Sequence, residues 1–291
     1  MKTSFISLFL LFACAFQASA EPGASLVVAT FNVNCGNFRL DQIRDAIKAS
    51  KADVIFLQET TTESERYLKS ELKSLYPNFC STGYERRFAE DRLAFLSKLP
   101  LREIVFSPPS GGYFGCYSAN CEVGKTTVKL INVHLAPFVI PPQPGILGLL
   151  KAMNDAEGRH AVEIESISRM LDGGQPTIVA GDFNSLSTSV APSRLRKIGL
   201  IDSFAATHPD ADNHPTWQGP VAAMNLQLRL DYIFQSSHFR CDRSEIVKQG
   251  GSDHFLVTSE FKILEPAGAI SGSPPIHGET NQTSSANGLG R

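Results

Sequence analysis

Short apolar runs alternate along the chain with longer stretches in which apolar residues recur at helical spacing. The apolar runs are rich in Val, Ile, Leu and Phe, a composition typical of buried β-strands. They predict strands at Ser25–Val33, Val54–Gln58, Arg92–Ser97, Thr127–Leu135, Thr177–Gly181, Leu230–Gln235 and His254–Phe261. Strands that alternate with helices indicate an α/β fold, and no linker in the middle of the chain divides it into two domains.

The stretches with helical spacing predict four helices, at Leu40–Ala49, Glu63–Leu75, Ala156–Leu171 and Pro192–Ile198. In the third helix, we expect the polar side to carry the charged and imidazole side chains of Arg159, His160, Glu163 and Arg169. The apolar contacts of this helix are expected from Val162, Ile167, Met170 and Leu171. Periodicity alone does not decide whether the sheet is parallel or mixed.

Polar side chains interrupt or follow six of the strand-like segments. They are Asn32, Glu59, His134, Asp182, Asn184, Asp231, Asp253 and His254. Asp182 and Asn184 are two residues apart, so in an extended segment their side chains point to the same side. If the strand ends lie along one rim, all of these groups converge on a single cleft.

Each of these residues also has a purely structural interpretation. Asp182 and Asn184 favour turns, and a histidine such as His134 often packs on a sheet. Glu59 can begin a helix, Asp231 can pair with a neighbouring arginine, and Asp253 with His254 can form a turn before a strand. The joint occurrence of six such segments favours a functional site, because six independent coincidences are improbable.

The set of polar residues suits the transfer of a phosphoryl group to water. Glu59 and a nearby aspartate offer hard oxygen ligands appropriate to Mg²⁺, with Mn²⁺ or Ca²⁺ as alternatives. A carboxylate can deprotonate water, while a histidine can donate a proton or stabilise charge on phosphate oxygens. A neutral amide from Asn32 or Asn184 can bind an oxygen without repelling the phosphate.

The motifs that contain these residues resemble those of the endonuclease/exonuclease/phosphatase superfamily, which includes deoxyribonuclease-I-like enzymes and neutral sphingomyelinases. The matching segments are Thr30–Val33, Leu57–Thr60, Asn132–Leu135, Gly181–Asn184, Leu230–Phe234 and Ser252–His254, in the order of the family's motifs. The resemblance implies a single-domain α/β/β/α sandwich of four layers with two mixed sheets. It also implies a divalent-metal-dependent hydrolase that cleaves phosphate esters by in-line attack of an activated water.

The resemblance assigns a role to each matching residue. Glu59 is the principal metal ligand, with Asn32 close to the ion or phosphate and Asp253 in the same network. Asp182 orients or activates water, and Asn184 binds phosphate. His254, held by Asp231, stabilises the transition state or protonates the leaving oxygen. His134 matches a second catalytic histidine, whose acidic partner remains open between Glu85 and Glu90; the number of metal ions also remains open.

Three features bear on the substrate. Arg86 and Arg92 are predicted to contact phosphate beside the cleft, which favours DNA, and the alternative is a solvated loop. Trp217 is predicted to line the cleft or to be structural. The near balance of charge, −2 overall, argues against a strongly basic surface that binds nucleic acid non-specifically.

An apolar segment after His134 favours a different substrate. Residues 137–150 contain prolines that oppose a helix, and we expect an apolar loop near the catalytic rim. Such a loop can contact a membrane surface and favour a phospholipid head group, or it can pack against its own core. The alternatives to a DNA-cleaving phosphodiesterase are therefore a sphingomyelinase-like phospholipid hydrolase, a phosphomonoesterase and a non-catalytic binding protein of the same fold.

The two ends of the chain differ from its middle. Residues 1–20 have a basic start, an apolar run and small residues at Ala18 and Ala20, the pattern of a cleaved signal peptide. This predicts secretion or export to the periplasm; lipid anchoring at Cys14 is the alternative. Residues 21–264 form the predicted catalytic domain, and residues 265–291, rich in Gly, Ser and Pro, form a predicted disordered tail.

Export makes the cysteines candidates for disulfide bonds. Cys116 and Cys121 bracket a segment that contains Ser and Asn, and we expect a bridge between them. Such a small disulfide loop is similar to one in secreted deoxyribonucleases and would favour DNA.

Overall fold

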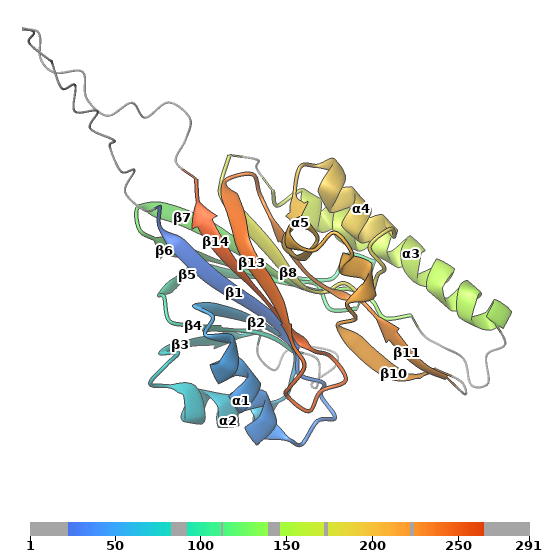
Figure 1. The fold of residues 1–291 in the computed structure, drawn as a ribbon, viewed down its shortest axis with the longest axis horizontal. Helices are drawn as coiled ribbons and strands as arrows, with labels where there is room; N and C mark the ends of the chain where they lie inside the picture. Colours follow the sequence, from blue (N-terminus) through green and yellow to red (C-terminus); the bar gives the residue numbers. More distant parts are fainter. Residues whose placement is uncertain are drawn as a thin grey trace, which may run out of the picture.

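The computed structural model describes residues 23–82, 92–111, 113–138, 146–171, 174–221 and 224–264, which form four layers (Figure 1). Two six-stranded mixed sheets pack against each other, and helices cover the outer face of each sheet. The prediction of a single-domain α/β sandwich with two mixed sheets is confirmed. No helix within the described ranges is both long enough and apolar enough to cross a membrane.

The first sheet is built around β1 (Ser25–Asn32), which pairs in parallel with β2 (Val54–Thr60) and antiparallel with β14 (Leu256–Ile263). The sheet continues beyond these strands with β13 (Phe239–Val247) on one side and with β4 (Arg92–Ser97) and β3 (Asn78–Ser81) on the other. Its outer face is covered by α1 (Leu40–Ser50) and α2 (Thr62–Leu72), which lie together at one side of the molecule in Figure 1.

The second sheet is built around β7 (Thr126–His134) and β8 (Thr177–Asp182), which pair in parallel. Its other strands are β5 (Leu101–Ser107), β6 (Cys116–Val123), β12 (Asp231–Gln235) and the short β9 (Ile201–Asp202). The outer layer contains α3 (Ile146–Ser168) and α4 (Val190–Lys197), which lie together on the side opposite α1 and α2 (Figure 1). The remaining elements are α5 (Ser203–Thr207), η1 (Ala211–Asn213) and the hairpin of β10 (Trp217–Val221) and β11 (Met224–Leu228).

The space between the sheets is filled by apolar side chains from both inner faces. Phe56 and Phe95 meet edge to face with ring centroids 4.9 Å apart, and Phe95 stacks on Tyr117 of the second sheet. Neighbouring residues of β1 and β2 alternate between this interior and the layer of α1 and α2. Burial on both faces explains why these strands read as nearly continuous apolar runs in the sequence.

The face of α3 that packs on the sheet differs from the prediction. His160 and Glu163 are buried, whereas Val162, expected in the apolar contact, is 48% exposed. The buried residues Ala152, Ala156, His160, Ile164 and Ile167 follow helical spacing, so the imidazole lies within the apolar stripe. The prediction was wrong because it placed polar side chains outside, although a buried polar group is stable when it is hydrogen-bonded.

The apolar segment after His134 is also partly helical rather than a loop. α3 begins at Ile146, ten residues before the predicted start, so residues 146–150 belong to its first turns. The prolines that oppose a helix, at 137, 141, 142 and 144, all precede this start. Leu147 and Leu150 are 79% and 58% exposed.

The expected disulfide between Cys116 and Cys121 is absent, and both residues are free thiols. They lie on the same strand, β6, five positions apart, so their side chains point to opposite faces. Cys116 packs in the layer between the second sheet and its helices, and Cys121 packs between the two sheets. The prediction was wrong because the segment between them is a strand and not a loop.

Several predictions fall outside the described residues. They concern the signal peptide at residues 1–20, lipid anchoring at Cys14, the phosphate contact of Arg86, the partner residues Glu85 and Glu90, and the tail at residues 265–291.

Candidate functional site

The strand ends of the two sheets bring together the polar residues predicted from the sequence. β8 lies between β7 and β12, and its last residue, Asp182, is in register with His134 on one side and Asp231 on the other. From the first sheet, Asn32 at the end of β1 reaches Asp182: Asn32 Nδ2 donates to Asp182 Oδ2 over 3.1 Å. The cleft therefore lies where the ends of β1, β7, β8 and β12 meet.

The backbone around Asp182 depends on the glycine that precedes it. Gly181 has a φ of 153°, and a Cβ at this position would lie 1.9 Å from the carbonyl oxygen of Val133. Only glycine allows β7 and β8 to approach this closely. Asn184 adopts a left-handed φ of 45°, and its backbone N–H donates to Asp182 Oδ1 over 2.8 Å. The Gly-Asp-Phe-Asn segment thus holds the Asp182 carboxylate in a fixed orientation.

Glu59 reaches the cleft through an irregularity in β2. The pairing of β2 with β4 shifts between Leu57 and Thr60, and Glu59 has a left-handed φ of 55°. A bulge of this kind redirects a side chain at a strand end. The Glu59 carboxylate accepts hydrogen bonds from Asn32 Nδ2 at 2.8 Å and from the backbone N–H of Cys35 at 3.1 Å.

His254 is bound by two carboxylates. Its Nδ1 donates to Asp231 Oδ2 over 2.9 Å, and its Nε2 lies 3.6 Å from Asp182 Oδ2. Thr216 Oγ1 accepts the backbone N–H groups of Leu230 and Asp231, which fixes the start of β12. The imidazole is therefore oriented with one nitrogen on Asp231 and the other directed at Asp182.

His134 lies on the other side of the same carboxylate. Its Nε2 is 3.5 Å from Asp182 Oδ2 and 3.9 Å from Glu59 Oε1. The ring of Phe114 stacks on the imidazole with centroids 4.1 Å apart and an interplanar angle of 9°. Two histidines from different sheets thus face one aspartate.

Burial and charge shift the pKa values of these groups. Burial raises the pKa of Asp182 to about 7; the charge of His254 opposes this shift and the charge of Asp231 adds to it. Burial opposes protonation of His254, but Asp231 and Asp182 outweigh it and raise its pKa to about 10. Burial also opposes ionisation of Glu59, yet His134 and hydrogen bonds from Asn32 and Cys35 lower its pKa. The site therefore contains both a proton acceptor and a protonated donor near neutral pH.

Two groups of side chains in the described ranges have geometry suited to a metal ion. Glu59, His134 and Asp182 form one group, and Asp182, Asp231 and His254 form the other, with ligand atoms within 4.8 Å of one another in each. The first group fits a divalent cation better, because Glu59 ionises readily and its carboxylate oxygens are hard ligands. In the second group, Asp231 and Asp182 raise the pKa of His254 to about 10, which disfavours the neutral imidazole that binds a metal ion.

Asn32 and Asp253, both predicted to lie at the metal, occupy different positions. Asn32 Nδ2 bridges the carboxylates of Glu59 and Asp182, so this residue lies in the centre of the cleft. Asp253 belongs to neither metal-compatible group. Its oxygens accept from Asn34 Nδ2 at 2.7 Å and from Trp217 Nε1 at 3.0 Å, and these bonds connect it to the edge of the site.

The predicted phosphate contact of Arg92 does not fit its environment. Arg92 is 1% exposed, its Nε lies 3.3 Å from Glu65 Oε1, and its Nη2 donates to Thr62 Oγ1. The side chain is held under α2 and does not lie on an exposed surface beside the cleft. This burial could not be predicted from the sequence, because an arginine at the start of a strand is usually exposed.

Three residues that contact the site were not predicted as part of it: Asn34, Phe114 and Thr216. Asn34 directly follows the Thr30–Val33 motif segment, and its position two residues after Asn32 was a usable signal. Phe114 and Thr216 lie in segments without any strand-end pattern. Only the folded chain places them beside His134 and Asp231.

The fold has many counterparts among solved structures. An endonuclease/exonuclease/phosphatase family protein from Bacteroides thetaiotaomicron superposes with a TM-score of 0.66 at 17% identity, covering 85% of this chain and 100% of the other. An endonuclease/exonuclease/phosphatase from Beutenbergia cavernae superposes with a TM-score of 0.60 at 16% identity. The match covers 83% of this chain and 72% of the other. TDP2 from Caenorhabditis elegans superposes with a TM-score of 0.61 at 17% identity, and the match covers 82% of this chain and 75% of the other.

No curated protein sequence matches the chain. At these low identities, the likeness to solved structures shows the fold alone. The family's sequence profile, however, matches residues 29–254, which include every strand end of the cleft from Asn32 to His254. The chain therefore belongs to the endonuclease/exonuclease/phosphatase family of metal-dependent phosphoester hydrolases.

Proposed function

We propose that the protein is an exported phosphodiesterase that hydrolyses DNA by attack of water in line with the leaving oxygen. The observation that carries the reaction is the position of Asp182 Oδ2, 3.5 Å from His134 Nε2 and 3.6 Å from His254 Nε2. A carboxylate between two imidazoles suits hydrolysis of a phosphate ester. The carboxylate can accept a proton from the attacking water, and an imidazole can donate one to the leaving oxygen. Membership of the family supports a phosphoester as the substrate.

Each residue has a distinct part in this reaction. Asp182 accepts the proton of the attacking water, which its raised pKa near neutrality favours. As the new bond between water oxygen and phosphorus forms, the bond to the leaving oxygen breaks, and His254 donates its proton to that oxygen. Asp231 keeps the His254 ring oriented throughout.

The remaining polar groups bind the phosphate and a divalent cation. We propose Glu59 as the carboxylate ligand of Mg²⁺, Mn²⁺ or Ca²⁺, with Asn32 Nδ2 bridging the carboxylates of Glu59 and Asp182. Such an ion, when bound, withdraws charge from the phosphate and offsets its repulsion by the carboxylates. We propose that His134 donates a hydrogen bond to a phosphate oxygen, and that Asn184 Nδ2, which donates to Leu135 O and to Asp182 Oδ2, does so in exchange for the 3.3 Å contact with Asp182.

One observation favours a phospholipid as the alternative substrate. Leu147 and Leu150 at the start of α3 are strongly exposed, and their helix follows the segment that leaves the cleft at His134. Exposed leucines at the start of this helix suit contact with a membrane surface. The absence of the Cys116–Cys121 bridge also removes one argument that the sequence offered for DNA.

The full chain should be assayed with supercoiled plasmid and with sphingomyelin vesicles, each in Mg²⁺, Mn²⁺, Ca²⁺ or EDTA. We expect plasmid nicking that EDTA abolishes and that falls about 10²- to 10⁴-fold in His254→Asn. His238→Asn serves as the control, because this half-buried histidine bonds Ser236 beyond the end of β12 opposite to Asp231. Metal-dependent head-group release with intact plasmid would replace DNA by phospholipid as the substrate, and no hydrolysis of either would refute the proposal.

A further inference from the structure

One turn of α3 contacts the backbone of two loops that leave the catalytic strands. His160 is completely buried, and its Nε2 lies 2.7 Å from the carbonyl oxygen of Ala136, two residues after His134. Its Nδ1 lies 2.8 Å from Ser185 Oγ, next to Asn184 in sequence. A single imidazole therefore joins the loop after β7 to the loop after β8.

One contact and the burial of the ring set its protonation state. A carbonyl oxygen only accepts, so Nε2 carries the proton and donates to Ala136. The Ser185 hydroxyl can donate or accept, so its contact is compatible with either state of Nδ1. Burial, the largest influence, lowers the pKa of His160 against the opposing charge of Glu157, whose Oε1 lies 3.6 Å from Nδ1, and this favours the neutral ring in which Nδ1 accepts from Ser185.

Glu163, one turn further along the same face of α3, holds the same loop by a second contact. The backbone N–H of Ala136 donates to the Glu163 carboxylate at 3.1 Å and 3.3 Å from its two oxygens. Ala136 thus has its carbonyl bound by His160 and its N–H bound by Glu163. Two buried side chains of α3 therefore fix both backbone polar groups of Ala136.

Glu163 also accepts a backbone hydrogen bond from Tyr113, the residue before Phe114. Because the ring of Phe114 stacks on His134, the same helical turn supports both the loop that follows His134 and the loop that packs on its imidazole. Ser185 is additionally held by Tyr232, whose hydroxyl donates to the Ser185 carbonyl oxygen over 2.9 Å.

We infer that His160 is a positioning residue: by donating to Ala136 and accepting from Ser185, it sets the relative position of His134 and Asn184 around the phosphate. His160 contacts neither Asp182 nor Glu59 in the described structure, so it acts only through the two loops. The inference rests on the proposed hydrolysis for its kinetic consequence, but the contacts themselves are independent of the substrate.

The test compares His160→Phe, which keeps an aromatic ring without either hydrogen bond, with His160→Gln, whose amide N–H can still donate to Ala136. His208→Phe is the control for the same substitution, because His208 lies outside the site, where it stacks on Phe204 with ring centroids 4.1 Å apart. Each full-length variant is assayed with bis(4-nitrophenyl) phosphate and Mg²⁺, well below its midpoint of thermal unfolding.

For His160→Phe we expect kcat to fall at least about tenfold with KM changed less than about threefold, because the misplaced groups act on the transition state. His160→Gln should recover most of this kcat, and His208→Phe should keep the wild-type value. A loss of kcat that follows thermal stability alone, equal in the Gln and Phe variants, would overturn the inference.

Hydrogen–deuterium exchange tests the positioning without any turnover. We expect peptides that contain Leu135 and Ala136 to exchange faster in His160→Phe, while peptides from β1 and β2 keep their wild-type protection. If the wild-type protein hydrolyses no phosphodiester, the proposed function fails and this measurement still decides the inference. Unchanged exchange around Ala136 would refute it.

Discussion

At the scale of single residues, the cleft works through one aspartate with four neighbouring side chains. Asp182 accepts from neutral amides of Asn32 and Asn184 and faces two imidazoles. The amides orient the carboxylate without adding charge, while the buried environment keeps its proton affinity near neutrality. Geometry and pKa therefore point to the same residue as the proton acceptor.

Replacing Asp231 by Asn should change the pH dependence of hydrolysis. Asp231 is a main cause of the raised pKa of His254, so its loss should lower that pKa, by about 1 unit or more. Because the protonated form of His254 is the active one, the alkaline limb of the kcat–pH profile should move to lower pH. A profile identical to that of the wild type would contradict the coupling of these two residues.

Glu163 should make folding stability depend on pH. Burial raises its pKa from the ordinary value of 4.5 to about 7, against the opposing hydrogen bonds from Ala136 and Tyr113. A raised pKa gives stability that is fully present below pH 4.5 and is lost as the pH rises through 7. The loss attributable to this group is about 3 kcal/mol of unfolding free energy.

This prediction is checked by urea unfolding of wild-type protein and Glu163→Gln across the range from acid to mildly alkaline pH. The stability of the variant relative to wild type should increase as the pH rises. Glu165→Gln is the control on the same helix, because its half-exposed carboxylate pairs with Arg194 at the surface. A constant difference between Glu163→Gln and wild type would show that Glu163 stays ionised or stays neutral throughout.

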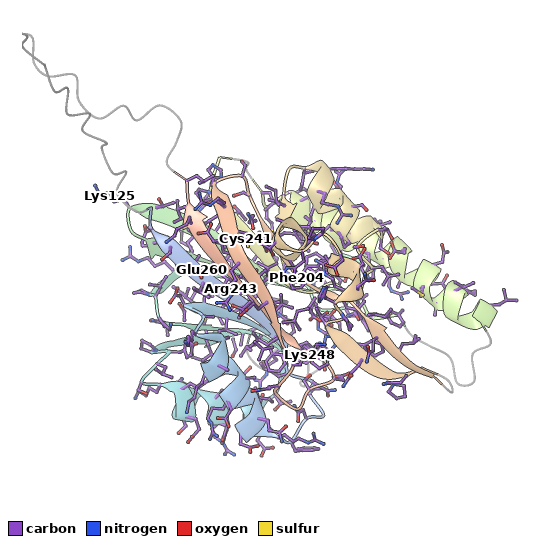
Figure 2. All side chains as sticks on the ribbon, viewed as in Figure 1. Lys125, Phe204, Cys241, Arg243, Lys248 and Glu260 are labelled. Atoms are coloured by element: carbon purple, nitrogen blue, oxygen red, sulfur yellow. The ribbon has the colours of Figure 1, made fainter. Side chains whose placement is uncertain are left out.

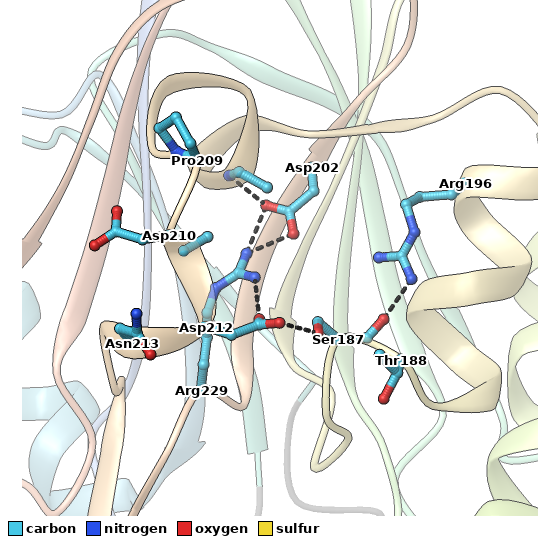
Figure 3. A pocket seen from close by; sticks show the side chains of 11 residues that line it. Ser187, Thr188, Arg196, Asp202, Pro209, Asp210, Asp212, Asn213 and Arg229 are labelled. Carbon is cyan, nitrogen blue, oxygen red and sulfur yellow. Dashed lines mark hydrogen bonds and ion pairs between the residues drawn. The ribbon is translucent and has the colours of Figure 1, made fainter.

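At the scale of elements, a buried ion pair joins α5 to the start of β12. Arg229 donates to both oxygens of Asp202, at 2.6 Å for Oδ1, and both side chains are almost fully buried. Asp202 also caps α5 through the N–H of Ala205, and the guanidinium of Arg229 lies 4.4 Å from the centroid of Tyr232. Figure 3 shows this pair in a cavity of about 350 Å³, with Asp212 bridging Arg229 and Ser187.

Arg229→Met should lower the free energy of unfolding by about 3–5 kcal/mol, because it leaves the Asp202 carboxylate buried without its partner. The double variant Arg229→Met with Asp202→Asn should regain part of this loss. Arg243→Met is the control: Arg243 lies on the exposed side of β13 (Figure 2), where its pair with Glu245 is solvated. Equal losses in the two single arginine variants, measured by urea unfolding, would contradict the buried role of Arg229.

The sequence predicted the central strands better than the peripheral ones. β4 was predicted with its observed bounds, and β1, β2, β7, β8, β12 and β14 within a few residues, because burial on both faces makes them continuously apolar. β3, β5, β9, β13 and the β10–β11 hairpin were missed, as was the inner strand β6, which was expected to be a disulfide loop. β5 and β13 expose much of one face and carry charged residues there, so their sequences lack the apolar run that identified the others.

At the scale of the whole molecule, a divalent cation should stabilise the fold by binding only to the folded cleft. At a concentration 100 times its Kd, the cation adds about 2.7 kcal/mol to the unfolding free energy. Mg²⁺ should therefore raise the midpoint of thermal unfolding, and EDTA should reverse the increase. Glu59→Gln should lose most of this shift, whereas Glu245→Gln, at the exposed surface of β13, should keep it. An equal shift in both variants would place the ion elsewhere.

The sequence by itself determined the α/β class, the central strands and the identity of the residues around Asp182. It did so because a strand end that must carry a polar group leaves a local mark: an apolar run that stops at Asn32, Glu59, His134 or Asp182. Family motifs of this kind are short and contiguous, so no knowledge of distant contacts is needed to find them.

Only the tertiary structure decided which side chains support the site from a distance. His160 and Glu163 were predicted on the polar face of a helix, yet they are buried against Ala136. Arg92 was predicted at the surface beside the cleft, yet it is buried against Glu65. Whether a polar side chain is exposed depends on a hydrogen-bonding partner far away in sequence. That partner is selected when the layers pack, and no local pattern of hydrophobic and polar residues records it.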